Sequence, residues 1–68
     1  MKKYNQGETL YCPACNKLPD GEDLPVEDYT VPNSEVGSIC ETECGHCYSL
    51  FVVETLTQNS RYVAYLDN

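Results

Sequence analysis

The sequence predicts a small all-β domain that depends on a cross-link between distant cysteines, and three observations lead to this fold class. Two Cys-x-x-Cys pairs stand 28 residues apart, one formed by Cys12 and Cys15 and the other by Cys44 and Cys47. The chain has 68 residues, no Trp and a single Phe, so its apolar core must be thin. Its C-terminal third is rich in β-branched and aromatic residues, which favour strands. Because chains below about 70–80 residues rarely fold on a core alone, we expect one domain, residues 1–68, that is stabilised by a metal ion.

The two cysteine pairs predict the metal and its ligands. Each pair can close a tight turn with both sulfurs on the same side, and two such turns complete the tetrahedral four-thiolate sphere that Zn²⁺ accepts. We therefore expect one structural zinc ion bound by Cys12, Cys15, Cys44 and Cys47. Zinc binding supplies about 10–16 kcal/mol in small zinc modules, which exceeds the net stability of an ordinary small domain. Little fold is expected without the metal.

Two further residues are alternative ligands, and iron is an alternative to zinc. Cys40 precedes Cys44 by four positions and His46 lies inside the second pair, so either could replace a cysteine ligand. The simpler interpretation makes Cys40 a small apolar residue on a strand and turns His46 toward solvent. Iron, as in a rubredoxin-like protein, could also occupy two Cys-x-x-Cys turns.

A disulfide framework in a secreted protein is the competing interpretation of the cysteines. The cysteine count is five, which is odd, and residues 1–7 contain no apolar run of the kind that a signal peptide requires. No stretch approaches the roughly 20 apolar residues of a membrane span. A reducing, cytoplasmic compartment is therefore expected, with no membrane association.

The charge of the chain limits the classes of partner that we expect. Eleven acids against four bases give a formal net charge of −7, and four thiolates with one Zn²⁺ would bring it to about −9. Nucleic-acid binding normally requires a basic stripe, whereas the only bases here are Lys2, Lys3, Lys17 and Arg61. Direct nucleic-acid binding is thus the less favoured alternative, and we expect a protein partner with a basic surface.

The N-terminal half is expected to be mostly irregular. Residues 1–7 are polar and are predicted to be disordered, and residues 8–11 form a short β-prone lead into the first cysteine pair. Asn16 tolerates the positive φ that the exit from such a turn often requires. Residues 18–35 are predicted to be an extended, solvated, acidic and Pro-rich loop, in which Val26, Tyr29 and Val31 are available to contact the core or a partner. This loop is either a plain connection or the recognition segment, with a candidate partner surface formed by Glu22, Asp23, Glu27, Asp28 and Tyr29.

The C-terminal half is expected to form the sheet. We predict strands at residues 36–42, 48–57 and 61–66, and a turn at residues 58–60. The sequence shows no helix with a 3.6-residue period. The strands predict a two- or three-stranded antiparallel sheet. An edge strand could pair with a second copy, so monomer and dimer both stay open.

Together, Cys12-Pro13-Ala14-Cys15-Asn16, Cys44-Gly45-His46-Cys47 and the strand hairpin that follows resemble the zinc ribbon family over most of residues 8–66. The resemblance implies the fold and the four-cysteine zinc site. It implies little about function, because zinc ribbons occur in transcription factors, ribosomal proteins, primases, enzyme appendages and small adaptors. The chain departs from the family in having Tyr48 where Gly is common and in its 28-residue spacer, which exceeds the usual spacing of about 15–20.

Catalytic interpretations fit the residues less well. The first cysteine pair looks like a thioredoxin redox motif, but that motif requires a following helix in a βαβ unit. The spacing of Cys40, Cys44 and Cys47 is similar to that of radical-SAM enzymes, whose barrel is far larger than this chain. A catalytic zinc needs an open coordination position. We therefore expect a non-enzymatic protein-interaction or regulatory module, such as an accessory factor of a larger nucleic-acid-handling machine; a direct nucleic-acid-binding ribbon and an iron or thiol redox protein are the alternatives.

Overall fold

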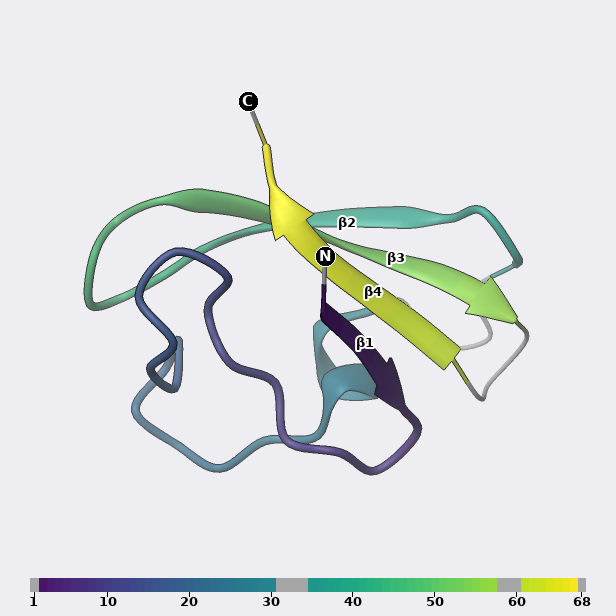
Figure 1. Cartoon of the computed structure of the whole chain (residues 1–68), viewed down its shortest axis with the longest axis horizontal. Coiled ribbons are helices and arrows are strands. Elements are labelled where there is room, and N and C mark those ends of the chain that lie inside the picture. The colour runs from purple at the N-terminus through teal and green to yellow at the C-terminus, as the bar shows by residue number, and fades with distance from the viewer. Residues whose placement is uncertain (1, 31–34, 58–60, 68) are drawn as a thin grey trace.

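A four-stranded antiparallel sheet organises the protein, and the segment between its first two strands lies along one side of it (Figure 1). The computed structural model describes residues 2–30, 35–57 and 61–67. Its strands, β1 (Lys2–Asn5), β2 (Ile39–Glu43), β3 (Leu50–Thr57) and β4 (Arg61–Leu66), lie in the order β1-β4-β3-β2. The predicted class, a small β domain, is confirmed.

Within these ranges the only helical element is η1 (Val26–Tyr29), a single 3-10 turn. In the described part of the chain, no helix has the length and apolar character needed to cross a membrane.

The first strand was not expected from the sequence. Residues 2–5, which fall in the segment predicted to be disordered, pair antiparallel with β4, so that Lys2 lies opposite Ala64 and Asn5 lies opposite Arg61. Tyr4 explains the difference, because its ring is 3% exposed and belongs to the core. One buried aromatic residue among polar neighbours anchors this edge strand, and the sheet therefore has four strands rather than two or three.

The predicted C-terminal strands are found, with later starts. β4 has the predicted bounds, whereas β2 and β3 begin at residues 39 and 50 instead of 36 and 48. Residues 36–37 form a turn in which Gly37 donates its N–H to Thr55 O at 2.8 Å. β3 starts late because residues 48 and 49 complete the turn after the second cysteine pair. The predicted turn at residues 58–60 lies outside the described residues.

The core lies between one face of the sheet and the N-terminal half of the chain. Alternation along β3 and β4 directs Phe51, Val53, Tyr62 and Ala64 to this face. The remaining fully packed members come from the other strands and the connecting segments, namely Tyr4, Leu10, Cys12, Val26 and Cys44. Two cysteines therefore belong to the same core as the sheet.

The acidic loop is anchored to the rest of the molecule at a few points. Pro19 and Val26 are fully buried, and the backbone of the loop hydrogen-bonds to residues 8–10, with Leu10 N–H donating to Leu24 O at 3.1 Å and Val26 N–H donating to Glu8 O at 2.8 Å. The β-prone lead at residues 8–11 contributes only one bridge, between Thr9 and Pro25. Residues 20–23 and Asp28 are exposed, as expected for a solvated loop, whereas Val26 belongs to the core and Tyr29 packs against it. Val31, the third residue expected to reach the core or a partner, lies outside the described residues.

Candidate metal centre

The two cysteine pairs fold into turns with the same backbone hydrogen bonds. In the first turn Asn16 N–H donates to Cys12 O at 2.8 Å and Cys12 N–H donates to Lys17 O at 2.9 Å. In the second, Tyr48 N–H donates to Cys44 O at 3.0 Å and Cys44 N–H donates to the carbonyl of Ser49 at 3.0 Å. We call these turns knuckle 1 (residues 12–17) and knuckle 2 (residues 44–49). Each knuckle presents its two sulfurs in an equivalent way.

Both knuckles also direct backbone N–H groups at sulfur. Ala14 N–H points to Cys12 Sγ at 3.3 Å, and His46 N–H points to Cys44 Sγ at 3.4 Å. Donors placed this way favour the thiolate form, which is the form that binds metals. The exit residues Asn16 and Tyr48 both have a φ of 61°, a conformation that Asn tolerates and that is unusual for a bulky residue.

The structure brings the four paired cysteines together. All four Sγ atoms lie within 4.8 Å of one another, and the Cys12–Cys47 and Cys15–Cys44 sulfurs are each 3.7 Å apart. A disulfide requires a separation of about 2.05 Å, so these are free thiols. Four sulfurs placed about 2.3 Å from a central Zn²⁺ at tetrahedral angles would lie about 3.8 Å from one another. The arrangement therefore fits a tetrahedral metal ion.

The electrostatics of the four sulfurs also favour a cation. Burial raises the pKa of Cys12 to about 12, whereas hydrogen bonds from the Ser49 side chain and backbone lower the pKa of Cys47 to about 6. Several thiolates in so small a space repel one another unless a positive charge lies between them. A divalent ion removes this repulsion and holds coordinating thiols deprotonated.

The two alternative ligands lie outside the cluster. Among the described residues the only group suited to a metal ion consists of Cys12, Cys15, Cys44 and Cys47. Cys40 lies in the middle of β2, opposite Val53, and is half-buried. His46 is exposed at the tip of knuckle 2, where its backbone, rather than its ring, contacts a sulfur.

A contact that the sequence did not reveal connects the acidic loop to knuckle 2. Gly45 donates its N–H to Pro19 O at 2.8 Å, and a Cβ at position 45 would lie 2.8 Å from the same oxygen. Only glycine allows this approach. The spacing of the cysteines carries no signal for the contact, because it depends on the path of a loop that is distant in the sequence. Pro19, Gly45 and Ser49 are therefore site-supporting residues that sequence reasoning missed.

Three of the five candidate partner-surface residues make contacts inside the molecule. The Thr9 hydroxyl donates to Asp23 Oδ1, and Gly7 N–H donates to Glu27 Oε1 at 2.8 Å. The Tyr29 hydroxyl donates to Asp20 Oδ2 at 2.9 Å, and burial together with this carboxylate raises the pKa of Tyr29 above its usual range. Glu22 and Asp28 are exposed and make no side-chain contact of this kind with a described residue. Asp23 and Glu27 thus already accept internal hydrogen bonds, although Asp23 is itself exposed.

Comparison with protein-family models, with curated proteins and with solved structures found no match for this chain. The resemblance to zinc ribbons therefore depends on the two cysteine motifs and the strand hairpin that follows them, and these comparisons assign the chain to no family.

Proposed function

We propose that this protein is a zinc-ribbon-like domain in which one structural zinc ion holds the fold together and the outer surface binds another protein. The observation that carries the proposal is the convergence of four sulfurs from two distant knuckles, with separations of 3.7 Å in the two closest cross-knuckle pairs. Zinc would join knuckle 1 to knuckle 2 and so connect the N-terminal half of the chain to the sheet. The domain would then be stabilised by metal and core together.

A structural role is favoured over a catalytic one. Four cysteines fill a tetrahedral sphere, whereas a catalytic zinc keeps a position for water or substrate. In the described ranges, no histidine or carboxylate shares the cluster with the cysteines. This donor set supports the proposal that the zinc is structural.

The charge of the surface supports a basic protein partner. The net charge is −7, and Glu22 and Asp28 on the loop and Glu41 and Glu43 on β2 are all exposed. Complementary charge speeds association and selects among partners. Proteins that handle nucleic acids commonly present basic surfaces, so an accessory or regulatory role beside such a protein is the most specific form of the proposal.

The metal part of the proposal is tested by native mass spectrometry with elemental analysis of the reduced protein, before and after a chelator. We expect one zinc per chain and loss of the far-ultraviolet circular dichroism of the sheet when zinc is removed. Iron in the purified protein would replace the proposal with a rubredoxin-like redox function. A metal-free protein that keeps its fold would contradict structural zinc altogether.

The partner part is tested by quantitative affinity capture with the zinc-loaded protein. Glu22→Gln with Asp28→Asn removes two exposed loop charges, and Glu35→Gln with Asp67→Asn removes two exposed charges elsewhere. We expect a basic protein to be captured by the wild type and the control pair, to be lost with the loop pair, and to be released by salt. Equal capture by both pairs would show that the loop does not carry the interaction.

A further inference from the structure

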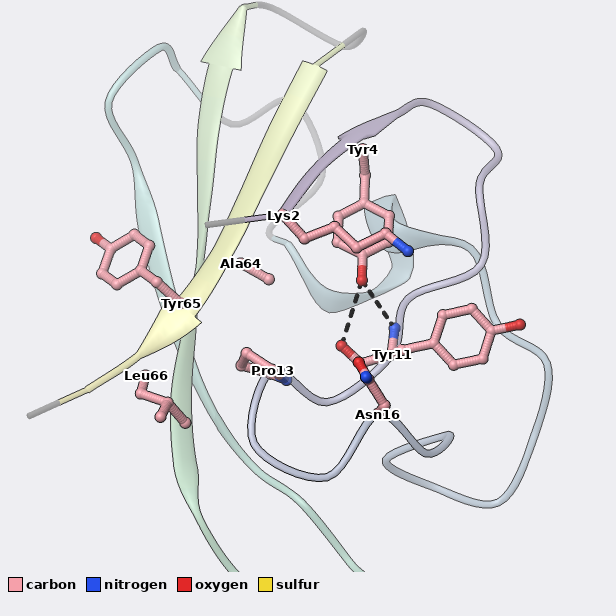
Figure 2. A pocket seen from close by; sticks show the side chains of 8 residues that line it. All are labelled: Lys2, Tyr4, Tyr11, Pro13, Asn16, Ala64, Tyr65 and Leu66. Atoms are coloured by element: carbon pink, nitrogen blue, oxygen red, sulfur yellow. Dashed lines mark hydrogen bonds between the residues drawn. The ribbon is translucent and has the colours of Figure 1, made fainter.

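A cavity of about 350 Å³ lies beside knuckle 1, where β4 ends (Figure 2). Its volume is near the lower end of the range of about 300–1,000 Å³ that is typical of ligand pockets. The residues that define its chemistry come from β1, knuckle 1 with the residue before it, and β4: Lys2, Tyr4, Tyr11, Pro13, Asn16 and Leu66. The metal centre uses none of these side chains, so the cavity is a separate feature.

Lys2 provides the charge of the cavity. Its Nζ lies 5.4 Å from the centroid of the Tyr4 ring and 5.6 Å from that of the Tyr11 ring. Cation–π contacts of this kind position an ammonium group without neutralising it. Among the described residues Lys2 has no ion-pair partner, and no carboxylate lines the cavity. An anion that enters would therefore not have to displace an existing carboxylate.

Hydrogen bonds fix the aromatic wall behind Lys2. The Tyr4 hydroxyl donates to Tyr11 O at 3.3 Å and accepts from Tyr11 N–H at 3.2 Å, as the dashed lines in Figure 2 show. The Tyr4 hydroxyl thus donates its proton to Tyr11 O and accepts a hydrogen bond from Tyr11 N–H. It fixes the position of the Tyr4 ring in the wall and is not a free ligand group. Asn16 differs, since its exposed side-chain amide makes no hydrogen bond with a described residue and retains its N–H donors.

The opposite wall is apolar and comes from the end of β4. Ala64, the last β4 residue opposite β1, faces Lys2, and Tyr65 and Leu66 pair with β3 alone in the described part of the sheet. Figure 2 shows the Tyr65 ring on the far side of β4, so this residue contributes backbone to the cavity. The Pro13 ring and the Leu66 side chain add the apolar surface.

We propose that this cavity binds a small apolar carboxylate, about the size of one peptide-terminal residue. The carboxylate contacts the Lys2 ammonium and the Asn16 amide, and the apolar group lies between Pro13 and Leu66. The net charge of −7 opposes the approach of an anion, but at physiological salt this effect is limited to acids within a Debye length of about 8 Å, and no carboxylate of a described residue lines the cavity. Short, charge-assisted hydrogen bonds at the site then decide binding.

The test is a ¹⁵N–¹H NMR titration of the metal-loaded protein with three probes. N-acetyl-leucine represents a peptide end, 4-methylpentanoate represents a free apolar acid, and N-acetyl-leucinamide is the neutral control. We expect saturable shifts at Tyr11, Asn16, Ala64 and Leu66 with at least one carboxylate and none with the amide. Tighter binding of N-acetyl-leucine than of 4-methylpentanoate would assign the site to peptide ends, because only the former has a peptide amide that can hydrogen-bond to backbone lining the cavity. Equal binding would assign it to free acids.

Two matched variants separate a specific contact from a general charge effect. Lys2→Gln and Lys3→Gln change the net charge equally, but Lys3 pairs with Val63 and belongs to the other face of the sheet. We expect Lys2→Gln to weaken carboxylate binding about fivefold and Lys3→Gln to leave it unchanged. Equal weakening by both variants, equal binding of the amide, or an absence of saturable shifts would overturn the proposal.

Discussion

Tyr48 is a residue in a backbone conformation that its side chain disfavours. It occupies the same position in knuckle 2 that Asn16 occupies in knuckle 1, and both residues have a φ of 61°. The Tyr48 side chain is 71% exposed, so few contacts compensate for the conformation. Tyr48, which follows Cys47, is therefore a residue whose side chain disfavours the backbone conformation of knuckle 2 in the candidate metal centre.

Tyr48→Asn should stabilise the metal-loaded protein by about 0.5–1 kcal/mol, because Asn tolerates the left-handed region better than Tyr. The measurement is the free energy of unfolding from chemical denaturation. The reciprocal change, Asn16→Tyr, should lower stability by a similar amount. An unchanged or reduced stability of Tyr48→Asn would mean that the tyrosine side chain contributes more than its exposure suggests.

Thr55 carries a second local conflict. Its Oγ1 is buried in β3 and has no hydrogen-bond partner in the described structure, and the residue is 1% exposed. Thr55→Val replaces this hydroxyl by a methyl group of the same shape, so we expect stability to rise by about 1 kcal/mol. Thr42→Val, at a partly exposed position of β2, is the control and should change stability by less than about 0.5 kcal/mol. A loss of stability in Thr55→Val would indicate that the hydroxyl is satisfied after all.

At the scale of elements, β1 shows how the packing of one side chain, Tyr4, can add a strand to a sheet. Four residues with a burial pattern of one buried and three exposed side chains carry no periodic signal. Tyr4 nevertheless packs in the core and bonds to the backbone just before knuckle 1. The strand therefore connects the sheet edge to the segment that enters knuckle 1.

Tyr4→Ala should lower the free energy of unfolding of the metal-loaded protein by about 2–4 kcal/mol, since it removes a buried aromatic ring. Tyr4→Phe keeps the ring and removes the hydroxyl, and should lower stability by about 1 kcal/mol. Denaturant titration measures both changes, and hydrogen exchange of the β1–β4 backbone amides reports on the strand itself. If Tyr4→Ala had no effect, residues 2–5 would not contribute to the folded state.

At the scale of the whole molecule, the core and the candidate metal centre are one unit. Cys12 and Cys44 belong to the apolar core, and the acidic loop reaches knuckle 2 through Gly45 and Pro19. Loss of the metal is therefore expected to disorganise the loop layer as well as the knuckles. A small core of this kind gives only a small net free energy of unfolding.

Cys12→Ser should abolish stable metal binding and the folded state, because it removes one of the four sulfurs of the proposed structural zinc site. Cys40→Ser should leave both unchanged, since Cys40 lies outside the cluster. Zinc competition with a chromophoric chelator, together with circular dichroism, measures the two effects. Equal loss of metal in the two variants would show that Cys40 takes part in coordination.

The sequence by itself predicted the all-β class, the position of β4, most of β3 and the four cysteines that the structure brings together. These features depend on local spacing and alternation, which a single chain displays directly. The tertiary structure alone decided the inclusion of β1, the packing of the acidic loop and the cavity beside knuckle 1. It also decided which acids accept internal hydrogen bonds, namely Asp23 and Glu27. Each of these depends on contacts between residues distant in the sequence, where one buried ring or one close backbone approach outweighs the local composition.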